Sequence, residues 1–129
     1  MKSLIATAVL ALGLATPAFA ADPVEGTWQT QVDDGSYAYV KLAPCGPAIC
    51  GNITRTFNAE GEYKSPNIGK ALVIDMAPKG GGAYEGKVWR PSNNKIYIGK
   101  MEMNGDRLTL KGCVAGGLIC SSQIWARIN

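Results

Sequence analysis

Gly26-Thr27-Trp28 near the start of the chain and Trp125-Ala126-Arg127 near its end are the segments that decide the fold. In a closed antiparallel barrel, the first and last strands are neighbours. The guanidinium of Arg127 can then lie across the indole of Trp28, a contact worth about 1 kcal/mol when it is partly desolvated. In a β-sandwich, the same two residues would be an ordinary core aromatic and a solvated cation. We therefore expect Trp28 and Arg127 to meet where a barrel closes.

Between these segments, apolar and polar side chains alternate in short stretches that Gly, Pro, Asn or Asp residues separate. This pattern predicts β-strands joined by turns. No segment has a sustained helical period, so we expect neighbouring strands to pair antiparallel. The expected strands are residues 24–32, 37–42, 52–57, 71–76, 83–90, 96–103, 107–114 and 121–128, with a long polar loop at 58–70. The predicted fold is an all-β, eight-stranded antiparallel up-and-down barrel, and the alternative is a β-sandwich.

The first twenty residues have the features of a secretory signal peptide. Lys2 gives a positive start, residues 4–14 are uncharged and mostly apolar, and Pro17 precedes the small-residue cleavage site Ala18-Phe19-Ala20. The apolar run is shorter than the roughly twenty residues that a membrane-spanning helix needs, which disfavours a retained anchor. We expect residues 1–20 to be removed, and residues 21–129 to form a single domain in the periplasm or outside the cell.

All four cysteines follow the predicted leader, in P-C-G-P-A-I-C-G at 44–51 and in G-C-V-A-G-G-L-I-C at 112–120. Each pair flanks a turn that contains glycine or proline, so local pairing is favoured among the three possible connectivities. A zinc site made by four thiolates is the alternative. It is disfavoured because neither spacing is the usual C-x2-C and because an exported protein meets oxidising conditions. The expected disulfides are Cys45–Cys50 and Cys113–Cys120.

Composition excludes several classes of function. The formal net charge of +3 is too small to indicate binding to nucleic acid. The chain has no histidine, which excludes histidine-based metal sites and Ser-His or Cys-His nucleophile pairs. Ser92-Asn93-Asn94-Lys95 matches the S-x-x-K pattern of penicillin-binding enzymes, but that pattern works on a helix and these residues are expected in a hairpin turn. We expect no enzymatic activity, cofactor or metal; a hydrolase site assembled only in space is the remaining enzymatic alternative.

A small barrel of eight strands is either filled by its own side chains or holds one small ligand. Strict alternation from Trp28 predicts which residues face inward. The candidates for ligand contact are Arg55, Phe57, Tyr97 and Met101, with Arg55 and Tyr97 as the polar anchors for an acidic or amphipathic ligand. The other expected lining residues are Thr30, Val32, Val40, Leu42, Ile53, Leu72, Ile74, Val88, Leu108 and Leu110. These residues predict a binding or carrier module for a small apolar, amphipathic or weakly acidic molecule.

If the barrel is filled, the alternative is a structural or protein-interaction module of the cell envelope. Such a module would use aromatic residues on the outer surface, and alternation leaves Tyr37, Tyr39 and Trp89 as the candidates. Tyrosine and tryptophan are typical of the residues that dominate protein interfaces.

Four motifs occur in the order found in a known family: G-T-W at 26–28, P-C-G-P-A-I-C-G at 44–51, G-K-V-W-R-P-S-N-N-K-I-Y at 86–97 and L-K-G-C-V-A-G-G-L-I-C-S-S-Q-I-W-A-R-I at 110–128. Together they resemble the small exported bacterial proteins of domain-of-unknown-function family two-one-four-seven. The resemblance covers residues 24–128 and implies a lipocalin-like barrel. The chain departs from the family pattern at Arg90-Pro91, where members often have Asp-Pro, and at Asn94, where glycine is usual.

Overall fold

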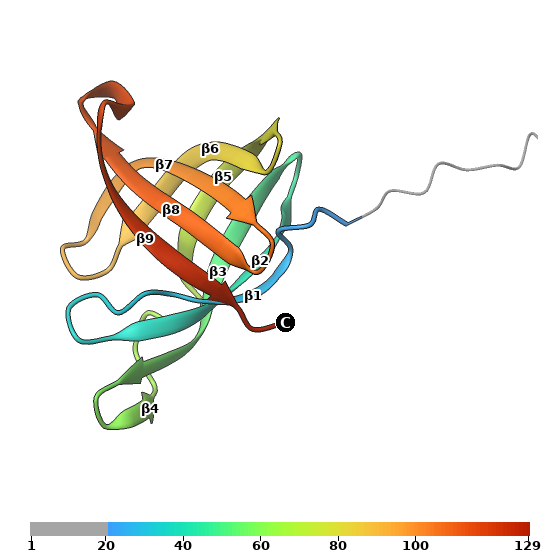
Figure 1. Ribbon diagram of the computed structural model, residues 1–129. Helices are drawn as coiled ribbons and strands as arrows, with labels where there is room; N and C mark the ends of the chain where they lie inside the picture. Colours follow the sequence, from blue (N-terminus) through green and yellow to red (C-terminus); the bar gives the residue numbers. More distant parts are fainter. Residues whose placement is uncertain (1–20) are drawn as a thin grey trace, which may run out of the picture.

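The computed structural model describes residues 21–129, which form a closed antiparallel β-barrel (Figure 1). The strands of the wall are β1 (Gly26–Gln29), β2 (Tyr37–Cys45), β3 (Ala48–Asn58), β5 (Ala71–Gly80), β6 (Ala83–Arg90), β7 (Lys95–Asn104), β8 (Arg107–Val114) and β9 (Ile119–Arg127). Each strand pairs with the next in this order, and β1 pairs with β9 to close the wall. The predicted up-and-down barrel is confirmed, and the sandwich alternative is wrong. The predicted signal peptide, residues 1–20, lies outside the described residues.

The connection between β3 and β5 contains a further short strand, β4 (Gly61–Tyr63), where a loop was expected. It pairs with the end of β3 and extends outside the wall. The turn forms because the Glu60 N–H donates to the Asn58 Oδ1 at 2.9 Å and because Gly61 adopts a φ of 115°. A short helical turn, η2 (Ala115–Gly117), lies between β8 and β9. Within residues 21–129, no helix has the length and apolar character needed to cross a membrane.

The barrel closes through a short pairing between β1 and β9, in which Trp28 lies opposite Arg127 and Gln29 lies opposite Ala126. The Arg127 guanidinium carbon lies 4.4 Å from the centroid of the Trp28 ring. Its Nη1 donates to the Glu25 carbonyl at 3.0 Å. The same side chain therefore stacks on the first strand and ties down the segment that precedes it.

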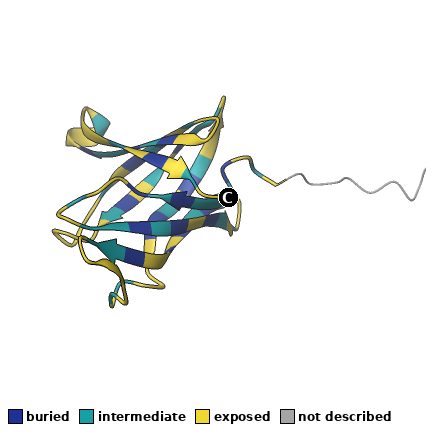
Figure 2. Cartoon of the chain, turned by 60° about the horizontal axis from the view of Figure 1, so that its bottom comes forward, coloured by how far each residue is buried: buried dark blue, intermediate teal, exposed yellow. Residues whose placement is uncertain are grey.

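Large apolar side chains fill the end of the barrel at which β1 and β9 pair. Those that are fully buried include Val24, Trp28, Leu42, Met76, Leu108 and Trp125. Gly51 leaves room for them, because a Cβ at this position would lie only 2.4 Å from the Leu42 Cδ2 and 2.8 Å from the Val40 Cγ1. Figure 2 shows the alternation of buried and exposed residues along the strands. This filled half forms the main core of the domain.

Both predicted disulfides are confirmed. Cys45–Cys50 joins the ends of β2 and β3 around their turn, and Cys113–Cys120 joins β8 to β9 beside η2. Each bond links two strands that are already neighbours. The two bonds therefore hold hairpins and do not connect distant parts of the chain.

A β-bulge in β3 corrects the sequence prediction for Arg55 and Phe57. Tyr39 lies opposite Arg55 but Val40 lies opposite Ile53, so Thr54 is an extra residue in the strand. Because the side-chain period of a strand is two, one extra residue reverses the faces of all that follow. Arg55 and Phe57 therefore lie on the outer surface, and the intervening Thr56 is buried inside.

Two further expectations for the lumen need correction. Val32 borders the mouth of the cavity but is 60% exposed, because β1 ends at Gln29 and the strand does not carry this residue into the lumen. Ile74 is only half-buried, and the preceding residue Val73 is fully buried in its place. The pairing of β3 with β5 shifts register just before this point, between Gly51 and Asn52.

Candidate functional site

The half of the barrel opposite the filled end contains a cavity of about 550 Å³. Its mouth lies where the connections from β1 to β2, from β3 to β5, from β6 to β7 and from β8 to β9 come together. Apolar side chains from the strands form most of the inner wall. They include Ala38, Ile53, Leu72, Val88, Tyr97 and Leu110. The lumen is thus filled at one end and open at the other.

Alternation along β8 explains much of this wall. Leu108 and Leu110 point inward and are buried, whereas Lys111 lies on the opposite face. Gly112 comes next on the inner side, and it lines the cavity. A Cβ there would lie 3.5 Å from the Tyr97 Cβ, which is ordinary van der Waals contact. The missing side chain therefore enlarges the cavity, and the backbone conformation does not require glycine.

The polar groups in the deep part of the cavity are paired with the protein itself. Thr30 Oγ1 accepts the N–H of Ala38 at 2.9 Å. Thr56 Oγ1 donates to the Tyr63 carbonyl at 2.5 Å and accepts the N–H of Ser65 at 3.3 Å. Because each of these hydroxyls already makes a hydrogen bond within the protein, the inner wall presents a mainly apolar surface to a ligand.

The mouth carries the charged groups of the site. Asp33 and Arg90 are the charged residues that line the cavity within the described part of the chain. They form a two-point ion pair, with the Arg90 Nη2 and Nε donating to the Asp33 carboxylate at 2.8 Å and 2.9 Å. Hydrogen bonds from Arg90 lower the pKa of Asp33, and partial burial opposes this shift. The ion pair links the connection after β1 to the turn after β6.

Tyr97 lies beside this ion pair. Its hydroxyl oxygen accepts a hydrogen bond from the Asn93 Nδ2 at 2.7 Å, so its own proton can be donated elsewhere. On the same turn, the Trp89 Nε1 donates to the Asn94 Oδ1 at 2.9 Å. The turn at 91–94 is therefore a hairpin held by its own asparagines, as the S-x-x-K stretch was expected to be.

The four residues expected to contact a ligand are not brought together. Tyr97 lines the cavity. Met101 is 2% exposed and packs in the filled half of the core, away from the cavity wall. Arg55 and Phe57 lie outside, for the reason given above. The cavity is also lined by three residues that were not predicted as ligand contacts, namely Thr56, Arg90 and Gly112. Of these, Gly112 had a signal in the sequence, because it follows the inward residues Leu108 and Leu110 at the same spacing of two.

On the outer surface, Arg55 and Phe57 belong to an aromatic face made with Tyr39 and with Tyr37, which also borders the mouth of the cavity. The Tyr37 and Phe57 rings stack at 4.8 Å with an angle of 11° between their planes. The Arg55 guanidinium carbon lies 5.4 Å from the ring centroids of Tyr39 and Phe57. Its Nη2 also pairs with the Glu62 carboxylate at 2.6 Å, and this hydrogen bond lowers the pKa of Glu62.

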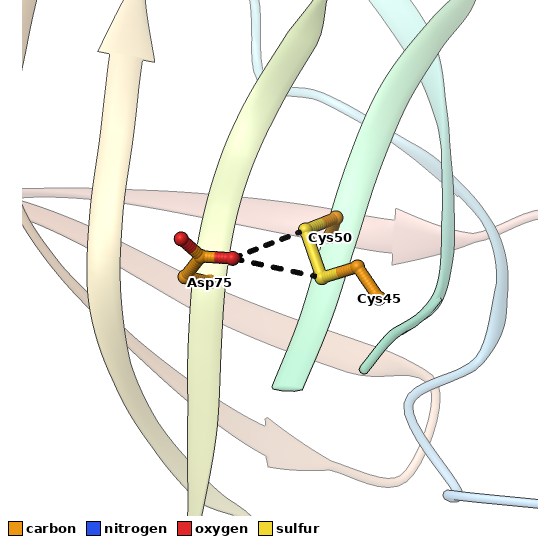
Figure 3. A group of neighbouring side chains, drawn as sticks. All are labelled: Cys45, Cys50 and Asp75. Carbon is orange, nitrogen blue, oxygen red and sulfur yellow. Dashed lines mark hydrogen bonds between the residues drawn. A yellow bond between two sulfur atoms is a disulfide. The ribbon is translucent and has the colours of Figure 1, made fainter. Parts of the chain in front are cut away.

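A second cluster, at the β2–β3 turn, has the composition of a metal site but not its chemistry. One Asp75 carboxylate oxygen lies 3.9 Å from the Cys45 sulfur and 3.7 Å from the Cys50 sulfur (Figure 3). Both sulfurs belong to a disulfide, so neither is a thiolate that can bind a metal, and neither has a proton to donate. The cluster is a set of sulfur–oxygen contacts beside a structural bond.

Comparison with known proteins places this geometry in a family. A solved structure with a similar fold is described as "Protein HP1028 from the human pathogen Helicobacter pylori belongs to the lipocalin family"; it is 15% identical, with a TM-score of 0.68 and 85% of each chain covered. At this identity the likeness shows the fold alone, which is lipocalin-like. No curated protein sequence matches the chain. The model of the family described as "Uncharacterized protein conserved in bacteria (DUF2147)" matches residues 26–127. The chain therefore belongs to the DUF2147 family of bacterial proteins.

Proposed function

We propose that this protein is an exported, non-enzymatic binding or carrier module that holds one small apolar or amphipathic molecule in the open half of the barrel. The observation that carries the proposal is the cavity itself, with its volume of about 550 Å³ and its apolar inner wall. Typical sites for small molecules have volumes of roughly 300–1,000 Å³ and are mainly apolar with a few polar groups. Two disulfides support an oxidising compartment, in agreement with the predicted leader.

The distribution of polar groups favours one orientation of an amphipathic ligand. The inner hydroxyls of Thr30 and Thr56 are already paired, so the apolar part of the ligand would lie deep, against Leu110 and Ile53. A polar or weakly acidic group would lie at the mouth, where Arg90 has guanidinium hydrogens beyond those given to Asp33. The anchor expected at Arg55 is replaced by Arg90 in this proposal.

Calorimetry with a panel of fatty acids, isoprenoids and aromatic acids tests the proposal. Binding is expected to have a negative heat-capacity change, because it buries apolar surface, and to alter the fluorescence of Trp89 at the cavity. Gly112→Leu should place a side chain in the cavity and weaken binding. Lys111→Leu is the matched control, since it adds the same side chain one residue away on the outer face. Equal binding by both variants would show that the cavity is not the site.

The aromatic face is a second candidate for a binding function. Tyr37, Tyr39, Phe57 and Arg55 form a continuous group outside β2 and β3, of the residue types that dominate protein interfaces. If no molecule of the panel binds in the cavity, this face becomes the favoured site, and the protein an interaction module. Tyr39→Ala changes the aromatic face but does not touch the cavity wall. This variant should therefore lose binding to a protein partner and keep binding of small molecules in the cavity.

A further inference from the structure

Among residues 21–129, the first part of β9 has a neighbouring strand on one edge only. β9 pairs with β8 from Ile119, opposite Val114, to Ala126, opposite Arg107. Its other edge pairs with β1 over two residues, because β1 ends at Gln29. Within residues 21–129, the edge from Ile119 to Ile124 therefore lacks a neighbouring strand. Figure 1 shows this edge of the red strand standing free above the β1–β2 hairpin.

Backbone groups of this edge point into the gap. Cys113 and Cys120 are directly opposite with their Cα atoms 4.1 Å apart, the short spacing of a non-hydrogen-bonded antiparallel pair. The N–H and C=O groups of Cys120, and of Ser122 and Ile124 after it, therefore point away from β8. The Ile124 N–H confirms this direction, since it donates to the Gln31 Oε1 at 2.9 Å. The Gln31 amide thus takes the place of a strand at one position.

The cavity opens sideways through this gap. All five consecutive residues from Ile119 to Gln123 border the cavity, and Gln31, Val32 and Asp33 border it from the other side. In a closed wall only alternate residues would face the lumen. A molecule placed along the edge would therefore have β9 backbone on one side and the cavity directly beneath it.

The sequence of the edge does not protect it. Natural sheets guard an exposed edge with charged residues, proline or a bulge. The edge residues Ile-Cys-Ser-Ser-Gln-Ile at 119–124 contain no charge and no proline, and Ile119 is 65% exposed. The disulfide to Cys113 and the pairing with β8 hold this edge in an extended conformation before any partner arrives. An extended, uncharged edge of this kind is suited to pairing with another chain.

We infer that β9 binds an extended peptide segment by strand addition. The segment occupies the position that β1 leaves at Gln29, pairs with the backbone of Cys120 and Ser122, and places alternate side chains in the cavity. Main-chain hydrogen bonds provide affinity in this mode, and the pocket for alternate side chains provides selectivity for small apolar residues. The inference rests on the proposed function in one respect, because the cavity must be open to a ligand.

The test uses the peptide acetyl-Lys-Val-Thr-Val-Thr-Val-Lys-amide and two forms of it that are N-methylated at alternate residues. Each methylated form keeps the side chains but lacks the donors of one edge. One form should bind about thirtyfold more weakly than the parent, since two hydrogen bonds at roughly 1 kcal/mol each are lost, and the other should bind almost equally. Protein amides report the same contact: exchange at Ser122 should slow, and exchange at Ser121, which faces β8, should not change.

Variants and a second probe separate the possible failures. Ser122→Pro removes the edge donor and should weaken peptide binding, whereas Ser122→Ala keeps the donor and should not. Anilinonaphthalene sulfonate, an anionic dye whose fluorescence rises in apolar surroundings, reports on the cavity without needing a strand edge. Dye binding without peptide binding would overturn strand addition and leave the proposed function standing, while loss of both would overturn the two together. Equal affinity of both methylated peptides would also overturn strand addition. If the protein instead forms dimers that Ser122→Pro abolishes, the partner at this edge is a second copy of the chain and the peptide proposal is overturned.

Discussion

Arg127 and Trp28 face each other across the two-residue pairing that closes the barrel, and the guanidinium of one lies over the ring of the other at 4.4 Å. Trp28 is fully buried, so Trp28→Ala should destabilise the protein by about 3–5 kcal/mol as a large-to-small core substitution. Arg127→Ala should cost less. Since the residues touch, the two losses should be non-additive in a double-mutant cycle measured by urea unfolding. Additive losses would contradict a stabilising contact.

Gly51 gives a test of packing in the filled half of the barrel. Gly51→Ala places a Cβ against Leu42 and Val40 at distances that real atoms do not adopt, so we expect a loss of about 1–3 kcal/mol from overpacking. Gly112→Ala is the matched control, since its Cβ meets neighbours at ordinary distances. Thermal unfolding of the two variants measures the difference. Similar unfolding midpoints for both would contradict the asymmetry between the filled and open halves.

The Asp33–Arg90 ion pair predicts a dependence of stability on pH. Because hydrogen bonds from Arg90 lower the pKa of Asp33 in the folded protein, the unfolded chain takes up the proton first as the pH falls. The contribution is fully present above the ordinary aspartate pKa of about 4 and is lost below it, as the pH passes the folded value. Asp33→Asn should therefore unfold more readily than the wild type at pH 7, and the difference should disappear in acid. A difference that persists at the lowest pH would indicate another cause.

Each disulfide should contribute modestly to stability, because each closes a short loop. The sequence separations are 5 and 7 residues, and the loop-entropy relation gives about 2 kcal/mol for each bond. Replacing Cys45 and Cys50 by alanine should lower the free energy of unfolding by that amount and leave a folded barrel. The same replacement of Cys113 and Cys120 gives the second double variant, and denaturant unfolding of both variants provides the measurement. Unfolding of either variant in buffer would show that the bonds do more than close local loops.

Ligand binding should not depend on Arg55. Its side chain lies outside the wall, between Tyr39 and Phe57, and it pairs with Glu62. We therefore expect Arg55→Ala to bind acidic molecules of the panel as the wild type does, and Arg90→Ala to bind them more weakly than neutral ones. Calorimetry with a fatty acid and its alcohol distinguishes the two variants. Loss of acid binding in Arg55→Ala alone would contradict the outward position of Arg55.

The barrel and the disulfides could be predicted from the sequence because both depend on local sequence patterns. Alternation, turn residues and cysteine spacing all act over a few positions. The positions of Arg55 and Phe57 were wrong because a single extra residue, Thr54, reverses the faces of β3, and no local pattern marks a bulge. Arg90 was missed because its role depends on Asp33, which is 57 residues away in the chain. Contacts of this kind arise only when the barrel closes.

The division of the lumen into a filled and an open half makes this barrel a favourable starting point for protein engineering. Most of the apolar burial belongs to the filled half, around Trp28 and Trp125. Side chains at the open end, such as Val32, Ser121 and Ser122, border the cavity but remain accessible to solvent. Substitutions there should change what the cavity accepts at little cost in folding, because surface substitutions typically alter stability by no more than about 0.5 kcal/mol. New specificities can thus be selected from libraries at the mouth without redesign of the core.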